Sequence, residues 1–191
     1  MAITIRTSAA LKEWALTGAA LALGRQNILL RKGGLLDEDG TFHLEHQAFL
    51  LLPTWLHQET GLVRREHRDL FELTPRETGE NARHVFFRHF ATVERVWALR
   101  EDDVEKVERA PQVWSRQYLD LRFGYKPEKP LLCAALRVWN LAQAVPYQLT
   151  GDQMGCRSWV ELPEPLVADA VPAQDDAEFQ IKLEQLKTLF G

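Results

Sequence analysis

Apolar residues recur along the chain with two different periods, and each period predicts a different kind of element. Between residues 8 and 23 every third or fourth residue is apolar, which predicts a helix that Ser8 caps and Gly24 stops. The same spacing over 176–190 predicts an amphipathic helix, with Asp175 or Asp176 as its cap. Shorter helices are predicted over residues 62–73, from Asp102 onward, and from Pro111 to Gly124.

Other apolar runs are too short, or too rich in β-branched and aromatic residues, to read as helices. These predicted strands cover residues 27–30, 48–52, 84–99, 131–139 and 157–162, and the run over 84–99 is either one long strand or a bent hairpin. Pro53 is expected to end the second strand, because proline cannot donate a ladder hydrogen bond. Polar segments rich in glycine and proline predict exposed turns at 35–40, 74–83, 126–130 and 151–155.

The order of these elements indicates the fold class. Strands do not alternate regularly with helices, so a doubly wound parallel sheet is not expected. We expect an α+β fold, with a mixed, largely antiparallel curved sheet and flanking helices. Residues 1–165 are predicted to form a single domain. Residues 166–191 are predicted to add a linker, marked by Pro163, Pro165 and Pro172, and an acidic C-terminal amphipathic helix.

Charge is unevenly distributed over the 191 residues. The formal net charge is -4. The segment from Glu161 to Gly191 alone holds seven acidic residues and two lysines, so it is more negative than the chain as a whole. The preceding residues are close to neutral and hold every histidine and arginine. A near-neutral body is not typical of a strong nonspecific nucleic-acid binder, but it allows a local basic groove.

The number of cysteines and the lengths of the apolar runs indicate the cellular compartment in which the protein is expected. The 2 cysteines, Cys133 and Cys156, form neither a disulfide framework nor a CxxC pair. The N-terminal segment lacks the long apolar core of a signal peptide, and no run approaches the length of a membrane span. We therefore expect a cytoplasmic protein with no membrane partner and no metal site.

The first candidate site is Arg31-Lys32-Gly33-Gly34, at the end of the predicted strand 27–30. Two glycines let backbone N–H groups converge on an anion, and the two cations add Coulomb attraction. The spacing is not that of a Walker loop. The alternative is an ordinary turn with a solvated lysine.

The second candidate is the bend that follows Pro53. His57 lies there, and an imidazole with an ordinary pKa can act as an acid, a base or a hydrogen-bonding group. Trp55 is suited to stacking on a base or another ring, whereas the other five tryptophans lie on apolar faces and are expected in the core. Histidine clustering alone is weak support: the 6 histidines lack any metal-binding spacing, and most are expected to be structural.

The third candidate is Arg157 with Ser158, next to Cys156. A guanidinium held after a tight turn suits a carboxylate or a phosphate. A nucleophilic role for Cys156 would require an adjacent base, and the simpler interpretation is a turn leading into a strand whose Trp159 packs on the core. Acids near Lys32, among them Asp37 and Glu45, lack the Glu-x-Lys strand pattern of a metal nuclease.

Several ordered motifs resemble the bacterial family catalogued as domain of unknown function 1802. The motifs are Leu11-Lys12-Glu13-Trp14-Ala15, Leu29-Leu30-Arg31-Lys32-Gly33-Gly34, Phe49-Leu50-Leu51-Leu52-Pro53-Thr54 with His57-Gln58, Leu121-Arg122-Phe123 with Tyr125, and Gly155-Cys156-Arg157-Ser158-Trp159. The match runs from about Ala9 to Pro165 and implies one domain but no activity. A looser analogy, of fold only, is to the ASCH, EVE and PUA-like small barrels, which implies a cleft for RNA or modified bases.

Three functional hypotheses remain open. The leading one is a module that binds a nucleotide or nucleic acid, with Arg31, Lys32 and Arg157 at the phosphate and Trp55 and His57 at the base. The second is a metal-dependent or histidine-assisted hydrolase or nuclease, in which His57 works with an acid such as Glu45 or Glu59. The third is an interaction module that docks on a partner or a second copy through the C-terminal helix.

Overall fold

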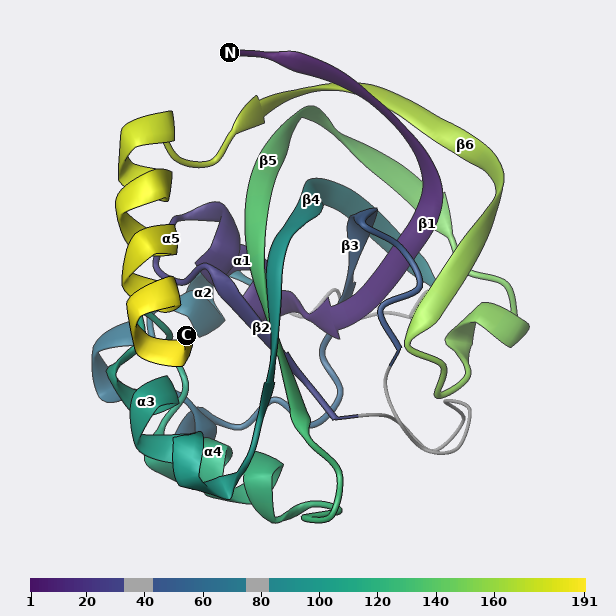
Figure 1. Ribbon diagram of the computed structural model, residues 1–191. Helices are drawn as coiled ribbons and strands as arrows, with labels where there is room; N and C mark the ends of the chain where they lie inside the picture. Colours follow the sequence, from purple (N-terminus) through teal and green to yellow (C-terminus); the bar gives the residue numbers. More distant parts are fainter. Residues whose placement is uncertain (33–42, 75–82) are drawn as a thin grey trace.

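The computed structural model of the protein describes residues 1–32, 43–74 and 83–191, in which one curved sheet closes into a near-ring (Figure 1). Its strands are β1 (Ile3–Trp14), β2 (Ile28–Arg31), β3 (Ala48–Thr54), β4 (His84–Leu99), β5 (Leu131–Gln148) and β6 (Trp159–Pro172). The strand order is β2-β5-β4-β3-β1-β6, and β6 also pairs with β5. Only β1 and β3 run parallel among these pairings. The expected α+β fold with a mixed, largely antiparallel sheet is confirmed.

Helices flank the ring. They are α1 (Ala15–Ala22), α2 (Leu70–Leu73), α3 (Val104–Arg109), α4 (Arg116–Gly124) and α5 (Asp176–Phe190). Figure 1 shows α3, α4 and α5 gathered on one side of the sheet, against the segments of β4 and β5 that extend beyond the ring. No described helix is long and apolar enough to cross a membrane.

The predicted helix over residues 8–23 is wrong in its first half, which belongs to β1. Near the end of this strand, Ala10 packs in one cluster of buried residues and its neighbours Ala9 and Leu11 pack in another, so both faces of the strand are covered. Ala9, Ala10 and Leu11 are consecutively buried, so the polar alternation that marks a half-exposed strand is missing. The end of the helix is as predicted: Gly24 follows α1 with φ +66°, the left-handed conformation that glycine adopts readily.

The prolines were misleading in two places. β3 continues through Pro53 to Thr54 instead of ending before it. The segment predicted as a linker continues β6, and two of its three prolines occupy a gap in the pairing, whereas Pro172 pairs with Trp139. Thr7 of β1 faces Leu166 while Ala9 faces Glu161, so the stretch with Pro163 and Pro165 bulges out of the ladder, where a missing N–H is tolerated.

The helix predicted over residues 62–73 is also wrong, since only α2 is α-helical there. Tertiary pairing prevails over the helical spacing: Val63 forms an isolated antiparallel bridge with Trp114. The backbone N–H of Arg64 donates to Val113 O at 2.9 Å on one side of that bridge. The same bridge keeps residues 111–114 out of the next helix, so α4 begins after Ser115, whose Oγ accepts a hydrogen bond from the N–H of Tyr118 at 3.4 Å.

The C-terminal helix is confirmed, including its cap, because the Asp175 side chain accepts from the N–H of Glu178 at 2.7 Å. Its apolar stripe of Phe179, Leu183 and Leu186 is buried against β4, β5 and α4. The stripe therefore serves the core of this chain, and self-association would need a different face of α5. A second cluster, which includes Leu50, Phe87 and Leu162, fills the ring.

Candidate functional site

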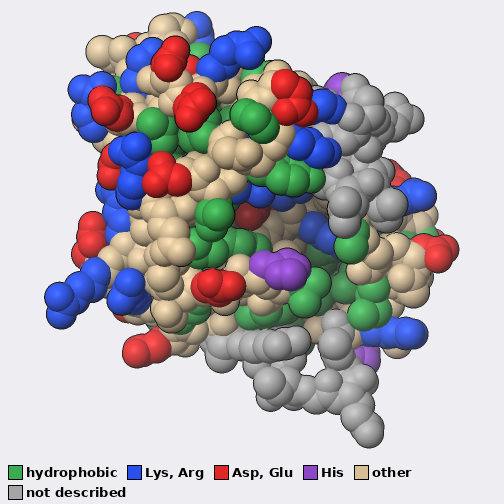
Figure 2. Space-filling view, turned by 90° about the horizontal axis from the view of Figure 1, so that it is seen from below, with side chains coloured by type: hydrophobic (Ala, Val, Ile, Leu, Met, Phe, Trp, Pro, Cys, Tyr) green, Lys and Arg blue, Asp and Glu red, His purple; other side chains and the backbone are tan. Residues whose placement is uncertain are grey.

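The face seen in Figure 2 is hollowed near its centre, with basic side chains in and around the hollow and hydrophobic ones beside it. On this face lies a cavity of about 430 Å³, which we call the cleft. Its polar lining includes Lys12, Glu13, Arg31, Arg122, Arg157 and Ser158, its rings are Trp14, Trp55 and Tyr118, and His57, His84 and Cys156 also border it.

Strand topology explains why residues so distant in sequence meet here. Since β1 and β3 are parallel, their carboxyl ends lie at the same edge, and Trp14 is aligned with Thr54. β6 begins beside that edge, where Leu11 faces Trp159. The backbone N–H of Lys12 donates to Ser158 O at 2.9 Å, which fixes the turn before β6 against β1.

The structure brings together most of the residues that the sequence singled out. Arg31, Trp55, His57, Arg157 and Ser158 all line the cleft. Gly33 and Gly34 lie outside the described residues, as do the acids at 37–39. The clustering joins three segments that the sequence could only treat separately.

Lys32 lies apart from the cleft, although it is adjacent to Arg31. Its side chain is buried, and its Nζ donates to Phe123 O at 2.7 Å. Burial lowers the pKa of Lys32, an effect that Glu128 partly opposes. The geometry therefore gives this ammonium a role in holding the end of α4 against β2.

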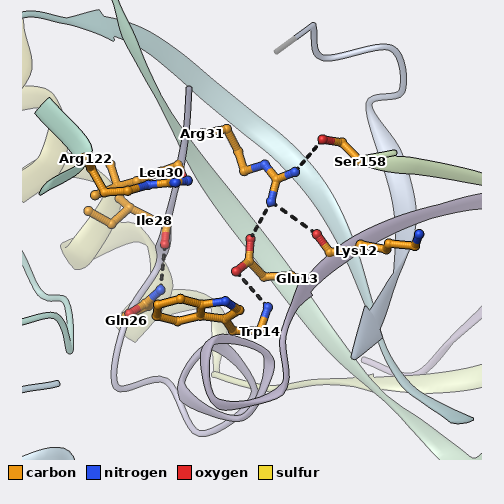
Figure 3. A network of polar contacts seen from close by, with 9 residues as sticks. All are labelled: Lys12, Glu13, Trp14, Gln26, Ile28, Leu30, Arg31, Arg122 and Ser158. Atoms are coloured by element: carbon orange, nitrogen blue, oxygen red, sulfur yellow. Dashed lines mark hydrogen bonds and ion pairs between the residues drawn. The ribbon is translucent and has the colours of Figure 1, made fainter. Parts of the chain in front are cut away.

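Arg31 is the hub of the polar network in Figure 3. Its Nη1 donates to Lys12 O and to Glu13 Oε2, each at 3.2 Å, and its Nη2 donates to Ser158 Oγ at 2.7 Å. Glu13 Oε1 in turn accepts from the N–H of Trp14 at 2.8 Å. Both partners of the ion pair are largely buried, with side-chain exposures of 16% for Arg31 and 9% for Glu13. These contacts fix the guanidinium between β1 and the turn before β6.

Lys12 lies on the other side of that turn, and its Nζ donates to Gly155 O. Burial lowers the pKa of Lys12, while the neighbouring Cys156 acts in the opposite direction. Arg157 is exposed at the rim. It makes no hydrogen bond or ion pair with any residue that the structure describes, so its guanidinium is available to a ligand.

The wall formed by α4 adds a fourth cation. The guanidinium of Arg122 lies 5.6 Å from the centre of the Tyr118 ring, and its Nη2 donates to Leu30 O at 3.3 Å. Its Nε is buried without a hydrogen-bond partner among the described residues. Tyr118 also contacts Trp14 edge to face, with ring centres 5.4 Å apart.

The bend after β3 holds Trp55 and His57. Trp55 is half-buried, and its indole N–H donates to Thr74 O at 3.1 Å, which fixes the ring plane. His57 is exposed and has φ 62°, an unusual value for a residue with a side chain. Gln58 ties the bend to the helix start, since its Oε1 accepts from the N–H of Leu16 at 3.0 Å.

Sequence reasoning missed Lys12, Glu13 and Arg122 as site residues. The first two were assigned to a helix, which hid the fact that they come at the carboxyl end of a strand. Arg122 belongs to the Leu121-Arg122-Phe123 motif, but α4 alone gives no sign of which cavity it faces. If residues 3–14 had been recognised as a strand, Lys12 and Glu13 would have been expected at its carboxyl end.

The lining of the cleft is strongly unbalanced in charge. Among the described residues it carries four cationic side chains and one carboxylate, Glu13, which is already paired with Arg31. Neither Glu45 nor Glu59 lines it. In the described part of the chain, no group of three or more histidine, cysteine, aspartate or glutamate side chains could hold a metal ion. The cleft is therefore suited to an anion with an aromatic or planar portion.

Comparison with known proteins gives a family match. The family described as Domain of unknown function (DUF1802) matches residues 10–185. No curated protein and no solved structure matches the chain.

Proposed function

The chain belongs to this DUF1802 family, whose description names no activity, and we propose from the geometry of the cleft that it binds a nucleotide or a short nucleic-acid segment. Arg31, Arg157 and Lys12 meet the phosphate in this proposal. The base stacks on Trp55, with His57 as a hydrogen-bonding group at the mouth. The observation that carries the proposal is the meeting of basic and aromatic side chains from five separate segments in one cleft.

Charge supports a phosphate ligand over a neutral one. The whole chain is acidic, yet the described residues that line the cleft include four cations and one carboxylate. Arg31 is held rigidly by its partners, which reduces the entropy lost on binding. A guanidinium fork is the group that best matches the geometry of phosphate.

Size and ring content support a nucleotide. The cleft volume of about 430 Å³ lies inside the range of small-molecule sites, about 300–1,000 Å³. Trp55 offers a fixed indole surface, and stacking of a base on such a ring contributes about 1–3 kcal/mol. The free thiols Cys133 and Cys156 fit a reduced cytoplasm, where such a module would meet its ligand.

Two histidines in the cleft favour a second candidate, a histidine-assisted hydrolase acting on a phosphate ester. His57 and His84 both border the cavity, and two imidazoles beside a phosphate are suited to acting as acid and base. The support is smaller, because neither acid expected to assist His57 lies in the cleft. Turnover of a nucleic-acid or nucleotide substrate that disappears in His57→Ala, with the fold intact, would establish it.

The binding proposal is tested by fluorescence anisotropy with short labelled RNA and DNA strands, and by calorimetry with nucleoside monophosphates. Strand binding should be measured at about 50 and 200 mM salt, where phosphate contacts reveal themselves by their salt dependence. We expect salt-sensitive binding. Absence of binding to strands and to mononucleotides at both salt concentrations would overturn the proposal.

Arg157 and Arg6 give a matched pair of variants. Both are exposed arginines with no partner among the described residues, but Arg6 lies on β1 away from the cleft. Arg157→Ala should weaken binding and reduce the salt slope by about 0.7, the value for one lost phosphate contact with a single strand. Arg6→Ala should leave both unchanged. Equal effects of the two variants would mean that only overall charge matters.

A further inference from the structure

A second cavity lies beside the cleft, with a volume of about 600 Å³. Its lining is mainly apolar and includes Leu51, Phe86 and Leu73 together with one face of α1. Glu13, Trp14, Leu52, Pro53 and Trp55 line both cavities. The two spaces are therefore neighbours that share a wall of two tryptophans, one proline and the buried carboxylate.

Small side chains on α1 leave this space open. Ala15, Gly18, Ala19 and Ala22 follow the spacing of one helix face, and all four line the cavity. A Cβ added at Gly18 would lie 3.8 Å from Cδ2 of His89, so the helix approaches that ring closely without touching it. A bulkier residue at any of these positions would occupy the cavity.

A polar pair interrupts the apolar lining. Nδ1 of His89 and Oδ1 of Asn140 are 2.9 Å apart, and both residues line the cavity. Burial lowers the pKa of His89, which favours the neutral ring, although the hydrogen bond with Asn140 opposes this. An amide oxygen only accepts, so Nδ1 carries the proton and Nε2 is a hydrogen-bond acceptor. Nε2 has no partner among the described residues.

Building on the proposed function, we propose that the second cavity takes the heterocyclic base of the nucleotide whose phosphate lies in the cleft. The base extends from the cleft into the second cavity along the residues that line both spaces. It stacks against Trp55 and donates an N–H to Nε2 of His89. The aromatic and aliphatic lining suits the faces of the ring, and the His89–Asn140 pair suits its polar edge. The same arrangement accepts a free nucleotide or a base splayed out of a strand.

Calorimetry with adenosine 5′-monophosphate and ribose 5-phosphate tests this assignment, because the two ligands share the phosphate and sugar and differ by the base. For the wild-type protein we expect the nucleotide to bind about 5- to 150-fold more tightly, the range that one stacked base provides. A parallel titration with a short RNA strand containing one adenosine distinguishes a free nucleotide from a base within a strand.

Two variants target the second cavity and leave the cleft cations in place. Ala19→Phe fills the cavity from α1, and His89→Phe keeps a ring of similar size while removing the acceptor nitrogen. In both, affinity for adenosine 5′-monophosphate should fall toward that for ribose 5-phosphate, whose own affinity should not change. Ala177→Phe is the matched control, since it makes the same change at an exposed helical alanine outside both cavities.

The outcomes separate the two proposals. If Ala19→Phe and His89→Phe are folded and keep the full preference for the nucleotide, the base is bound elsewhere and this inference is overturned, while the phosphate site in the cleft stands. If wild-type protein binds both ligands equally, the second cavity plays no part in recognition. If it binds neither ligand nor strand, the proposed function and this inference fail together. Ribose 5-phosphate binding serves as the folding check in each variant.

Discussion

The cleft and the side of the molecule covered by α3, α4 and α5 contain similar residues in opposite circumstances. On the helical side, the rings of Trp97 and Phe190 pack with their centres 5.2 Å apart, and Arg137 lies over the Phe179 ring and pairs with Asp176. In the cleft, by contrast, Trp55 borders open space and Arg157 has no partner among the described residues. Basic and aromatic residues thus indicate a binding site only where the fold leaves them uncovered.

Arg31 and Lys32 show this contrast within two adjacent residues. Successive side chains of a strand point to opposite faces, so one cation reaches the cleft while the next is sealed against Phe123. Of two adjacent basic residues at the end of a strand, only one is therefore expected to reach the same binding site. The predictions below test whether the cleft and the helical side also differ in what they contribute to stability and to ligand binding.

The largest expected effect is on the helical side. Phe179 is 2% exposed in the core under α5, so Phe179→Ala should lower the free energy of unfolding by about 3–5 kcal/mol. Urea denaturation measures the loss. Ile181→Ala, at a position 61% exposed on the same helix, should change it by less than about 0.5 kcal/mol. A small effect of Phe179→Ala would mean that α5 is not integral to the core.

A smaller loss of stability, combined with a gain in binding, is expected for Glu13→Gln. The change removes a countercharge from a largely buried guanidinium, which should cost about 1–3 kcal/mol of stability. The same change leaves Arg31 with more unbalanced positive charge, so phosphate should bind more tightly. Denaturation and phosphate titration give the two readouts, with the exposed Glu164→Gln as control. Weaker phosphate binding would show that Glu13 positions Arg31 rather than restraining it.

Lys32→Met tests whether Lys32, unlike its neighbour Arg31, contributes to stability and not to ligand binding. The variant removes the donor to Phe123 O and should destabilise the protein by about 1 kcal/mol, with ligand affinity unchanged. Arg157→Ala should behave in the opposite way, with lower affinity and unchanged stability. A clear loss of affinity in folded Lys32→Met would return Lys32 to the phosphate site that the sequence suggested.

The smallest effect concerns pH and the half-buried imidazole of His89, in the second cavity. Burial lowers the pKa of His89 from its ordinary 6.5, so below that pH the unfolded chain takes up a proton more readily than the folded one. Stability should therefore be complete above pH 6.5 and decline as the pH falls below it. His67, whose pKa burial also lowers, contributes in the same direction. The decline should be shallower in His89→Phe, measured by denaturation at several pH values, and an unchanged slope would assign it to other groups.

Local patterns sufficed where an element is defined by its own residues. β4 was predicted over its full length, and α5 was predicted with its cap and stripe, because each shows a clear period and clear ends. β1 was misread because its burial depends on β3 and β6, which no local period can reveal. The bridge between Val63 and Trp114 altered two predicted helices in the same way. Residues of the cleft were found where a turn marked them, as at His57 and Arg157, and missed where only the parallel pairing of β1 with β3 placed them.

The closure of the ring by β6 has a consequence for the way this chain is made. β6 pairs with β1, where Ala170 faces Ile3, and also with β5. During synthesis β1 leaves the ribosome before the other strands. The edge of β1 that pairs with β6 stays unpaired until residues 159–172 have been synthesised. Contacts this distant in sequence slow folding and expose strand edges to aggregation. Since Arg157 and Ser158 complete the cleft, a ribosome-bound chain that stops before them has no finished site. The proposed binding site should therefore form in a single late step, once these residues are in place.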